Sequence, residues 1–371
     1  MKTILIWSTS DTSHVRMSNL LAGLKNEPVK IIDLTIPVWK AEQNKAILGV
    51  LSIFWRMLHL LFTYLILTVR YLFAPKHDLV LVPYMGQIDL LVIKPLAWLR
   101  RKPVVWDIYI SLYDTVVFDR KSISKSNLVA KLIYCLEWIN FKLADITIAD
   151  TEPHARYMKE LFNLKKEPHV VHIGANSKEF YPMKKELKIP TDKFSVLFYG
   201  NLSPMHGVET IIQAAALLAD ETEIEFLIIG EGQSSKSIDD LIAEKQIKNV
   251  TRKSHVPYAD LNKIINDSDI GLGVFADNPK GNNVVPNKAY QMLAAGIPII
   301  TADTVGMREV LIHNPLVKVV PFEDENALVN AILQLKQEPK NDRTERNLKA
   351  FSVTEKTVAR QFLKVIDDAG V

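Results

Sequence analysis

A strand, loop, helix and second strand follow one another between residues 270 and 301, and this order limits the fold more than any other stretch. The helix is predicted to end at Gly296, because glycine suits the left-handed position after a helix, and Pro298 prevents its continuation. Strands joined by a helix at this spacing indicate a parallel sheet. The four predicted parts are Ile270–Phe275, Ala276–Asn283, a helix from about Lys288, and Ile299–Thr301.

The start of this helix is a candidate phosphate site. The first N–H groups of a helix lack partners within it, and its dipole is positive at that end, so anions are attracted there. Lys288, in the first turn, adds a fixed positive charge. An ordinary strand-to-helix turn with a solvated lysine would explain the same residues, so the turn alone does not establish a function.

The same alternation of short apolar strands and helices runs through the whole chain and predicts two Rossmann-like parallel-sheet domains that face each other across a cleft. We expect an N-terminal domain over residues 1–182, which the C-terminal helix at 354–371 joins, and a second domain over 190–351. The polar stretch 181–193 contains two prolines and reads as the linker between them.

Charge and cysteine content restrict the class of protein. The net charge is +3, but residues 1–180 carry +7 and the remainder −4, so the first half suggests an anionic partner such as a phospholipid surface or a polyprenyl phosphate. Charges scattered over solvated faces would give the same imbalance. A single cysteine, Cys135, excludes an internal disulfide. With no secretory signal visible, we expect a cytoplasmic protein.

Residues 46–73 are strongly apolar but are interrupted by Arg56, His59 and Arg70. No interval between these reaches the roughly 20 apolar residues that a membrane span needs. Apolar residues recur three and four positions apart, which indicates a helix. This helix either belongs to the core or also enters a membrane interface, which would make the protein peripheral on the inner face of the membrane.

Polar residues follow two strands of the predicted first sheet. His14 and Arg16 come after the first strand, and Asp107 comes after the fourth, with Asp114, Asp119 and Arg120 further along the loop. Ligands of open parallel sheets lie beyond the carboxyl ends of the strands, so His14 and Arg16 are candidates to line a cleft. The three aspartates and Arg120 are candidates to orient the hydroxyl groups of a sugar or to stabilise developing positive charge. Capping and solvation of the loops are the alternative. The first loop lacks GxGxxG, which argues against a dinucleotide there.

The motifs of the chain, taken in order, resemble a known family. These segments are VVHIGANSKEFYP, FYGNLSPMHGVETIIQAA, FLIIGEGQ, DIGLGVF and VVPNKAYQMLAAGIPII. Together they resemble the retaining glycosyltransferases of the GT-B fold, family four, over most of the chain. The resemblance implies that a sugar moves from a nucleoside diphosphate sugar to a hydroxyl acceptor with its anomeric configuration kept. It also implies that no metal or cofactor takes part.

The resemblance carries over residue by residue, with departures. Asn201 and His206 stand where the family commonly has an arginine and a lysine on the donor phosphates, so Lys288 is expected to carry more of that charge. Asn283 and Gln291 stand where it commonly has two glutamates. The implied catalytic residues are Asp107, His206 and Lys288. The implied donor-binding residues are Gly200, Asn201, Gly207, Glu231, Gly232, His255, Val256, Asn283, Val284, Val285, Pro286, Asn287 and Gln291. The implied acceptor-side residues are His14, Arg16, Asp114, Asp119 and Arg120.

Synthesis of a cell-surface polysaccharide or glycolipid is the implied process, with a sugar or a lipid-linked molecule as acceptor. Two other functions fit the same fold, a non-catalytic binding protein with a decayed site and a nucleotide-sugar epimerase, which would turn over donor without an acceptor. No stripe of alternating basic and aromatic residues is present, so a nucleic-acid partner is not expected.

Overall fold

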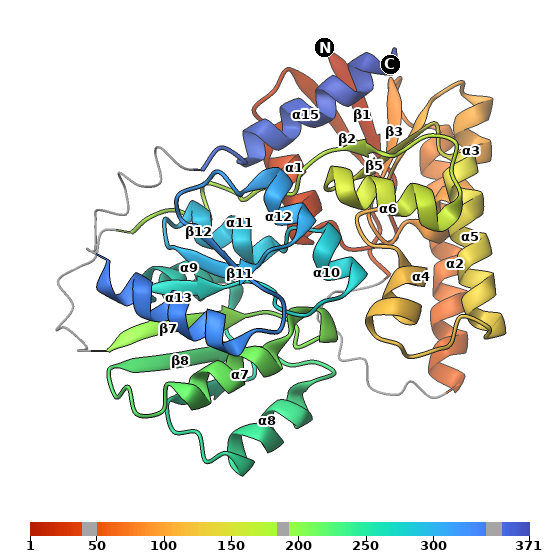
Figure 1. Ribbon diagram of the computed structural model, residues 1–371. Coiled ribbons are helices and arrows are strands. Elements are labelled where there is room, and N and C mark those ends of the chain that lie inside the picture. Colours follow the sequence, from red (N-terminus) through yellow and green to blue (C-terminus); the bar gives the residue numbers. More distant parts are fainter. Residues whose placement is uncertain (39–49, 184–192, 339–350) are drawn as a thin grey trace. The chain divides into compact units, whose positions relative to one another are not determined.

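A computed structural model describes residues 1–38, 50–183, 193–338 and 351–371 and confirms the α/β class (Figure 1). The chain divides into two compact units, each built on a six-stranded sheet. Residues 1–114, 123–173 and 355–371 form the first unit, and residues 115–122 and 174–354 form the second. Most of the predicted linker at 181–193 lies outside the described residues, as does the start of the apolar segment 46–73.

The first sheet has the strand order β2-β1-β3-β4-β5-β6, and all its described pairings are parallel. β3 and β4 are buried along their whole length, which explains why both read as continuous apolar runs. The strands are β1 Lys2–Ile6, β2 Val29–Asp33, β3 Leu79–Val82, β4 Val104–Asp107, β5 Ile146–Ala149 and β6 His169–Val170.

The last helix of the chain packs against the first one in this unit. A Cβ atom at Gly23 of α1 would meet the backbone oxygen of Glu355 at 1.9 Å, so only glycine permits this approach. Asn127 and Thr151 cap α5 and α6 through their side chains. The helices are α1 Val15–Leu24, α2 Val50–Leu72, α3 Gln87–Leu99, α4 Leu112–Asp114, α5 Leu128–Leu143, α6 Glu152–Phe162 and α15 Glu355–Asp368.

The second sheet has the order β12-β11-β10-β7-β8-β9 and is also parallel throughout its described pairings. Its strands are β7 Phe194–Tyr199, β8 Ile224–Ile229, β9 Val250–Lys253, β10 Ile270–Leu272, β11 Ile299–Ala302 and β12 Val317–Val320. Its helices are α7 Val208–Leu217, α8 Ser235–Glu244, α9 Tyr258–Asp267, α10 Pro279–Asn283, α11 Asn287–Ala294, α12 Val305–Val310 and α13 Glu325–Gln337.

Three local predictions need correction. The strand predicted at Ile270–Phe275 ends at Leu272, because the backbone of Phe275 turns to donate to the carbonyl of His206 at 3.0 Å. The predicted polar loop at Ala276–Asn283 contains α10, whose first turn is capped by the Asn278 side chain. The loop predicted after β4 is helical, with α4 followed by a π-helical turn at Thr115–Asp119.

The end of α11 agrees with the prediction. Gly296 has φ of 76°, in the left-handed region that favours glycine. β12, α12 and α13 follow where no element was predicted.

Candidate functional site

The second sheet reverses its strand order between β7 and β10, the place where open parallel sheets bind ligands. Gly200 follows β7 there, and a 3₁₀ turn at Pro204–His206 leads into α7. α11 begins at Asn287, after the loop that follows β10. Residues from three separate segments are therefore brought to one edge of the sheet.

Gly200, His206 and Lys288 meet around one small space. A Cβ atom built on Gly200 would lie 3.6 Å from Nζ of Lys288 and 4.0 Å from Nε2 of His206. Gly200 has φ of 143°, a conformation that side chains disfavour, so the backbone itself keeps this space open. The structure thus brings together three of the residues that the sequence assigned to the donor site.

Lys288 is buried at its charged end. The residue is 5% exposed, and Nζ has no hydrogen-bond partner within the part of the chain that the structure describes. Nζ lies over the Phe198 ring, 3.6 Å from its centroid. Burial lowers the pKa of Lys288 well below its usual range. A buried cation is stable only with a compensating partner, so this position favours an anion.

His206 shares this environment. Burial lowers the pKa of its imidazole well below the usual range, and the neighbouring charge of Lys288 lowers it further. Its Nδ1 lies 3.1 Å from the hydroxyl oxygen of Ser203, so its other ring nitrogen, Nε2, faces the space above Gly200.

The first turn of α11 contains no acidic side chain. The positive end of the helix is therefore not neutralised by a carboxylate of its own.

Gly207 holds the two loops of this site together. It has φ of 58°, and a Cβ atom there would lie 2.5 Å from the backbone nitrogen of Ala276. The loop after β7 and the loop after β10 therefore touch backbone to backbone at this point. Any larger residue would separate them.

Gln291 is buried and fixed by two tyrosines. The hydroxyl of Tyr199 donates to Oε1 of Gln291 at 2.9 Å, and Nε2 of Gln291 donates to the hydroxyl of Tyr258 at 3.4 Å. Tyr258 in turn donates to Oε2 of Glu179 at 3.2 Å. The motifs did not reveal these contacts, because the four residues are far apart in the chain and Tyr258 lies outside every motif that resembles the family.

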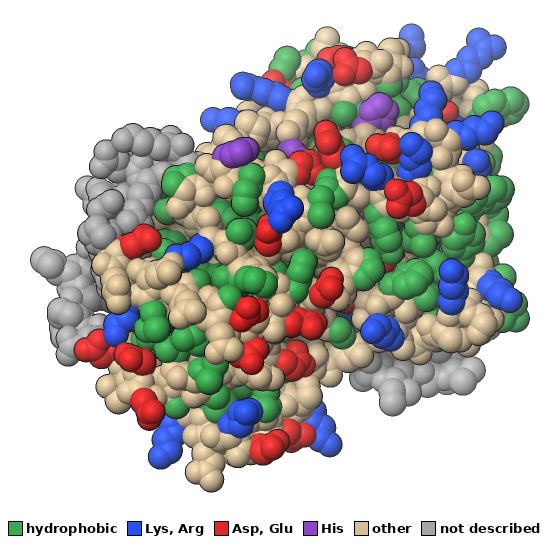
Figure 2. Space-filling view, viewed as in Figure 1, with side chains coloured by type: hydrophobic (Ala, Val, Ile, Leu, Met, Phe, Trp, Pro, Cys, Tyr) green, Lys and Arg blue, Asp and Glu red, His purple; other side chains and the backbone are tan. Residues whose placement is uncertain are grey.

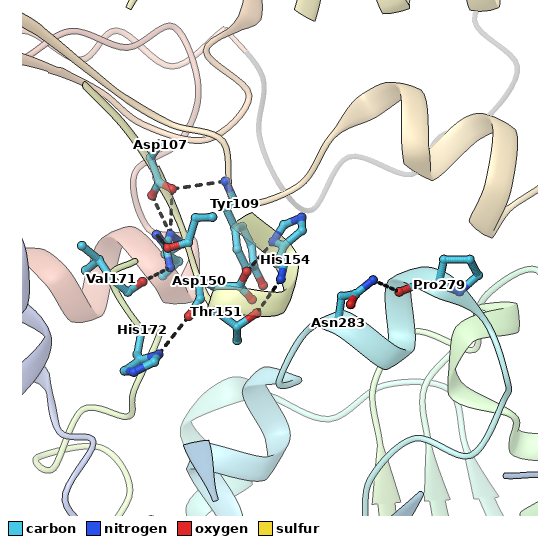
Figure 3. A network of polar contacts seen from close by, with 11 residues as sticks. Asp107, Tyr109, Asp150, Thr151, His154, Val171, His172, Pro279 and Asn283 are labelled. Atoms are coloured by element: carbon cyan, nitrogen blue, oxygen red, sulfur yellow. Dashed lines mark hydrogen bonds and ion pairs between the residues drawn. The ribbon is translucent and has the colours of Figure 1, made fainter. Parts of the chain in front are cut away.

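The remaining predicted donor-side residues differ in exposure. Val285 is buried, and the amide of Asn283 is turned onto its own helix, where it donates to the carbonyl of Pro279 at 2.7 Å (Figure 3). The exposed residues are Asn201, Glu231, Gly232 and His255, and the partly exposed ones are Val256, Asn283, Val284, Pro286 and Asn287.

In the first unit, Asp107 forms a buried ion pair with Arg16. Nε of Arg16 lies 2.7 Å from Oδ2 of Asp107, and the guanidinium also donates to the carbonyl of Val171 at 2.8 Å. Figure 3 shows Asp107 with its hydrogen bonds at this position. Asp107 is 2% exposed and additionally accepts from the backbone of Tyr109. Its carboxylate therefore joins strands and a helix of this unit.

An aromatic cluster surrounds His14 at the point where the first sheet reverses its order, between β1 and β3. The His14 ring lies 5.4 Å from that of Tyr84 and 5.3 Å from that of Tyr109. Burial lowers the pKa of His14, so the neutral imidazole is favoured. Tyr84 was missed by the sequence analysis, because it follows an apolar strand without any polar motif.

A histidine and an aspartate that the sequence analysis also missed lie next to β5. Asp150 accepts a hydrogen bond from Nδ1 of His154, and the backbone nitrogen of His154 is capped by Thr151 (Figure 3). Both side chains are buried. The backbone oxygen of Asp150 lies 2.9 Å from Nδ1 of His172. His154 therefore binds the side chain of Asp150 and His172 binds its backbone, and both contacts fix the turn after β5.

The three polar residues predicted after Asp107 do not share one environment. Asp114, in the first unit, accepts from the hydroxyl of Tyr157 at 2.7 Å. Asp119 belongs to the second unit, where Nζ of Lys280 lies 3.4 Å from its carboxylate. The backbone oxygen of Arg120 accepts from Gln233. Among the described residues, no group of three or more His, Cys, Asp and Glu side chains could hold a metal ion.

Comparison with known proteins identifies a family match over the part of the chain that contains the site around Lys288. Residues 180–350 match the family Glycosyl transferases group 1. This stretch is similar to the domain of that family and spans less than half of the chain. It contains all of the second sheet and the site around Lys288.

A curated relative, WcaI of Escherichia coli (strain K12), is described as a candidate colanic acid biosynthesis glycosyl transferase. It is 28% identical over 187 residues, which cover 50% of this chain and 46% of WcaI. The match thus spans about half the length of that relative.

Solved structures resemble the whole chain and show that it has the GT-B fold. Sucrose-phosphate synthase from Thermosynechococcus elongatus has a TM-score of 0.72 at 16% identity, and the match covers 99% of each of the two chains. Anabaena Alr3699/HepE, in complex with UDP and glucose, has a TM-score of 0.67 at 14% identity, again with 99% of each chain covered. Identity at this level supports the fold rather than a substrate.

Proposed function

We propose that this chain is a retaining hexosyltransferase that uses a nucleoside diphosphate sugar as donor and a hydroxyl group as acceptor. The group 1 domain supports the general class. The observation that carries the proposal is the buried, unpartnered ammonium group of Lys288 above Gly200, at the start of α11. A diphosphate is an anion of suitable chemistry for a buried cation beside a helix N-terminus.

In the proposed reaction, the bond between the anomeric carbon and the diphosphate breaks, and negative charge grows on the departing phosphate. Lys288, the helix dipole and a donor hydrogen on Nε2 of His206 would stabilise that charge. The acceptor oxygen would attack from the same face, and its proton would pass to the leaving phosphate oxygen. These groups would supply the positive charge without a metal ion or a cofactor.

The acceptor side is assigned to the first unit. The cluster of His14, Tyr84 and Tyr109 offers aromatic faces and an imidazole at the reversal point of that sheet. Aromatic rings suit the apolar faces of sugars. The likeness to WcaI supports a sugar or lipid-linked acceptor in polysaccharide synthesis.

The proposal is tested by thermal shift of the full chain with UDP, GDP and ADP, followed by assay of the corresponding nucleotide sugars. A nucleotide that binds the folded state raises the melting temperature by mass action. We expect one of them to stabilise wild type and to lose that effect with Lys288→Ala. Transfer should fall roughly 100-fold or more in the same variant, the range for loss of one charge-stabilising group.

Lys236→Ala is the matched control, because this exposed lysine lies on α8 of the same unit. It should bind and transfer as wild type does. Retention is tested by following the anomeric proton of the product by NMR. Turnover of the donor without any acceptor and without hydrolysis would indicate an epimerase, and binding without turnover of any kind would indicate a non-catalytic protein.

A further inference from the structure

A broad apolar surface lies on the first unit, over helices α2, α3 and α5. α2 buries one stripe, which includes Leu60, Leu67 and Tyr71, and turns its other apolar side chains outward. α3 packs between α2 and α5, so their outward sides form one continuous layer (Figure 1). We call this layer the apolar helical face; its prominent exposed side chains are Trp55, Leu61, Leu65, Val69, Trp98 and Leu132.

Large apolar side chains on this face are widely exposed. Trp98 is 75% exposed, and Phe73, at the end of α2, is 85% exposed. Figure 2 shows hydrophobic side chains gathered along the edge where Figure 1 places these helices, with lysine and arginine side chains beside them. Contiguous apolar patches of this kind mark surfaces that are covered by something else.

Charge on the three helices has one sign. Their two described carboxylates, Asp89 and Glu137, are buried and point inward, where Asp89 accepts from Thr9 and Glu137 accepts from Ser111. The exposed charged side chains are cations, on Arg70, Lys131 and Lys142, while the partly exposed Lys94 pairs with Asp145. An apolar surface with only positive charges complements an apolar layer that is bordered by anions.

A cavity of about 540 Å³ lies at the end of α3, beside this face. Trp98, Arg101 and Lys102 line it, and within the described chain neither Arg101 nor Lys102 forms an ion pair. The one carboxylate of the lining, Asp145, is occupied by Lys94 at 2.6 Å and by the backbone of Val104. The cavity therefore presents uncompensated cations next to an exposed indole.

We propose that the apolar helical face docks on a bilayer surface that contains anionic lipids, and that this cavity receives a lipid phosphate headgroup. Tryptophan at the edge of an apolar layer and lysine with an apolar stem suit the boundary between headgroups and acyl chains. Nζ of Lys142 lies 5.2 Å from the centroid of the Trp138 ring, and a lysine paired with a tryptophan in this way suits that boundary. Within the described residues no helix is long and apolar enough to cross a membrane, so the protein would lie on the surface.

The test is cosedimentation of the full chain with vesicles of phosphatidylcholine, alone or mixed with phosphatidylglycerol. We expect binding to the mixed vesicles that weakens as salt is raised, because anionic headgroups attract the cations. Arg101→Gln with Lys102→Gln should weaken it about fivefold for each charge removed. Leu61→Ser with Leu65→Ser should weaken it roughly tenfold or more, because apolar side chains leave the interface.

Leu217→Ser and Lys236→Gln are matched controls on the second unit, where both residues are exposed, and they should bind vesicles as wild type does. An unchanged circular-dichroism spectrum with a cooperative melting transition shows that each variant is folded. Lys288→Ala should still bind vesicles, so this proposal and the donor site fail separately. The proposal is overturned if no vesicle binds, or if the face variants bind normally. It is also overturned if the chain dimerises and Leu61→Ser with Leu65→Ser abolishes the dimer, since a second copy would then cover the face.

Discussion

The side-chain nitrogen of Lys288 lies 3.6 Å from the centroid of the Phe198 ring and has no hydrogen-bond partner within the described chain. The aromatic face gives some stabilisation to the cation but does not replace the water that burial removes. The empty protein should therefore be less stable with this lysine than with an apolar side chain of the same length.

Lys288→Met should raise the free energy of unfolding of the nucleotide-free protein at neutral pH, because burial disfavours the charged form of the lysine and a methionine has no charge to bury. The folded-state pKa is lowered, so the unfolded state binds more protons between that pKa and 10.5. Wild-type stability should consequently rise relative to the variant as the pH rises through this window. Urea unfolding at several pH values measures this, and a variant less stable than wild type throughout would contradict it.

Gly200→Ala should abolish nucleotide binding. A Cβ atom at this position enters the space in front of Lys288 and His206, and it also strains a backbone with φ of 143°. Strain of this kind costs roughly 1–3 kcal/mol, so the variant should fold but melt earlier. Calorimetry with whichever of UDP, GDP and ADP stabilises wild type measures the binding.

Gly370→Ala controls for the strain alone, because Gly370 has φ of 78° with nothing within 4 Å of the added Cβ. It should bind nucleotide as wild type does. Undiminished binding by Gly200→Ala would show that the space above Gly200 is not where the nucleotide sits.

Asp107→Asn should lower the free energy of unfolding by about 3–5 kcal/mol, because it leaves the buried guanidinium of Arg16 without its counter-charge. The matched control is Asp303→Asn, which removes a partly exposed ion pair with Arg308 and should cost no more than about 1 kcal/mol. Thermal and urea unfolding compare the two. If Asp107→Asn is as stable as wild type but inactive in transfer, Asp107 has the catalytic role that the family resemblance implies.

Tyr199→Phe should cost about 1–3 kcal/mol of stability, since Oε1 of buried Gln291 loses its donor. The conservative exchange keeps the ring, so the loss reports the hydrogen bond. Tyr181→Phe, on an exposed tyrosine, should change unfolding very little. Equal melting temperatures for the two variants would show that the Gln291 network adds nothing to stability.

The central strands of this chain leave a clear signal in the sequence, because burial on both faces produces apolar runs. β7, at Phe194–Tyr199, is an example, since Lys193 and Gly200 bound its largely apolar run on both sides. The early end of β10 was not predictable, because the backbone nitrogen of Phe275 donates a hydrogen bond to the carbonyl of His206, which is distant in the sequence. The capping of α10 by Asn278 before a proline was visible in the sequence and was overlooked.

Residues of the candidate site were predictable only where the signal lies within a single segment of the chain. Lys288 stands at the start of a helix and could be singled out from its own neighbours. The position of Lys288 over Phe198, and of Gln291 between Tyr199 and Tyr258, depends on the strand order, which no local pattern encodes. The ion pair between Asp107 and Arg16 was not predictable either, because the two residues lie in different segments of the chain.

The most direct test of the account is the proton balance of diphosphate binding by Lys288. Isothermal titration calorimetry of whichever of UDP, GDP and ADP stabilises wild type, in buffers with different ionisation enthalpies between neutral pH and pH 10.5, gives the number of protons taken up. If the pyrophosphate stabilises the charged form of a lysine whose pKa burial has lowered, wild type should take up a proton on binding, and Lys288→Met should bind weakly without uptake. Binding of this nucleotide with the same affinity and the same proton uptake in Lys288→Met would contradict the account.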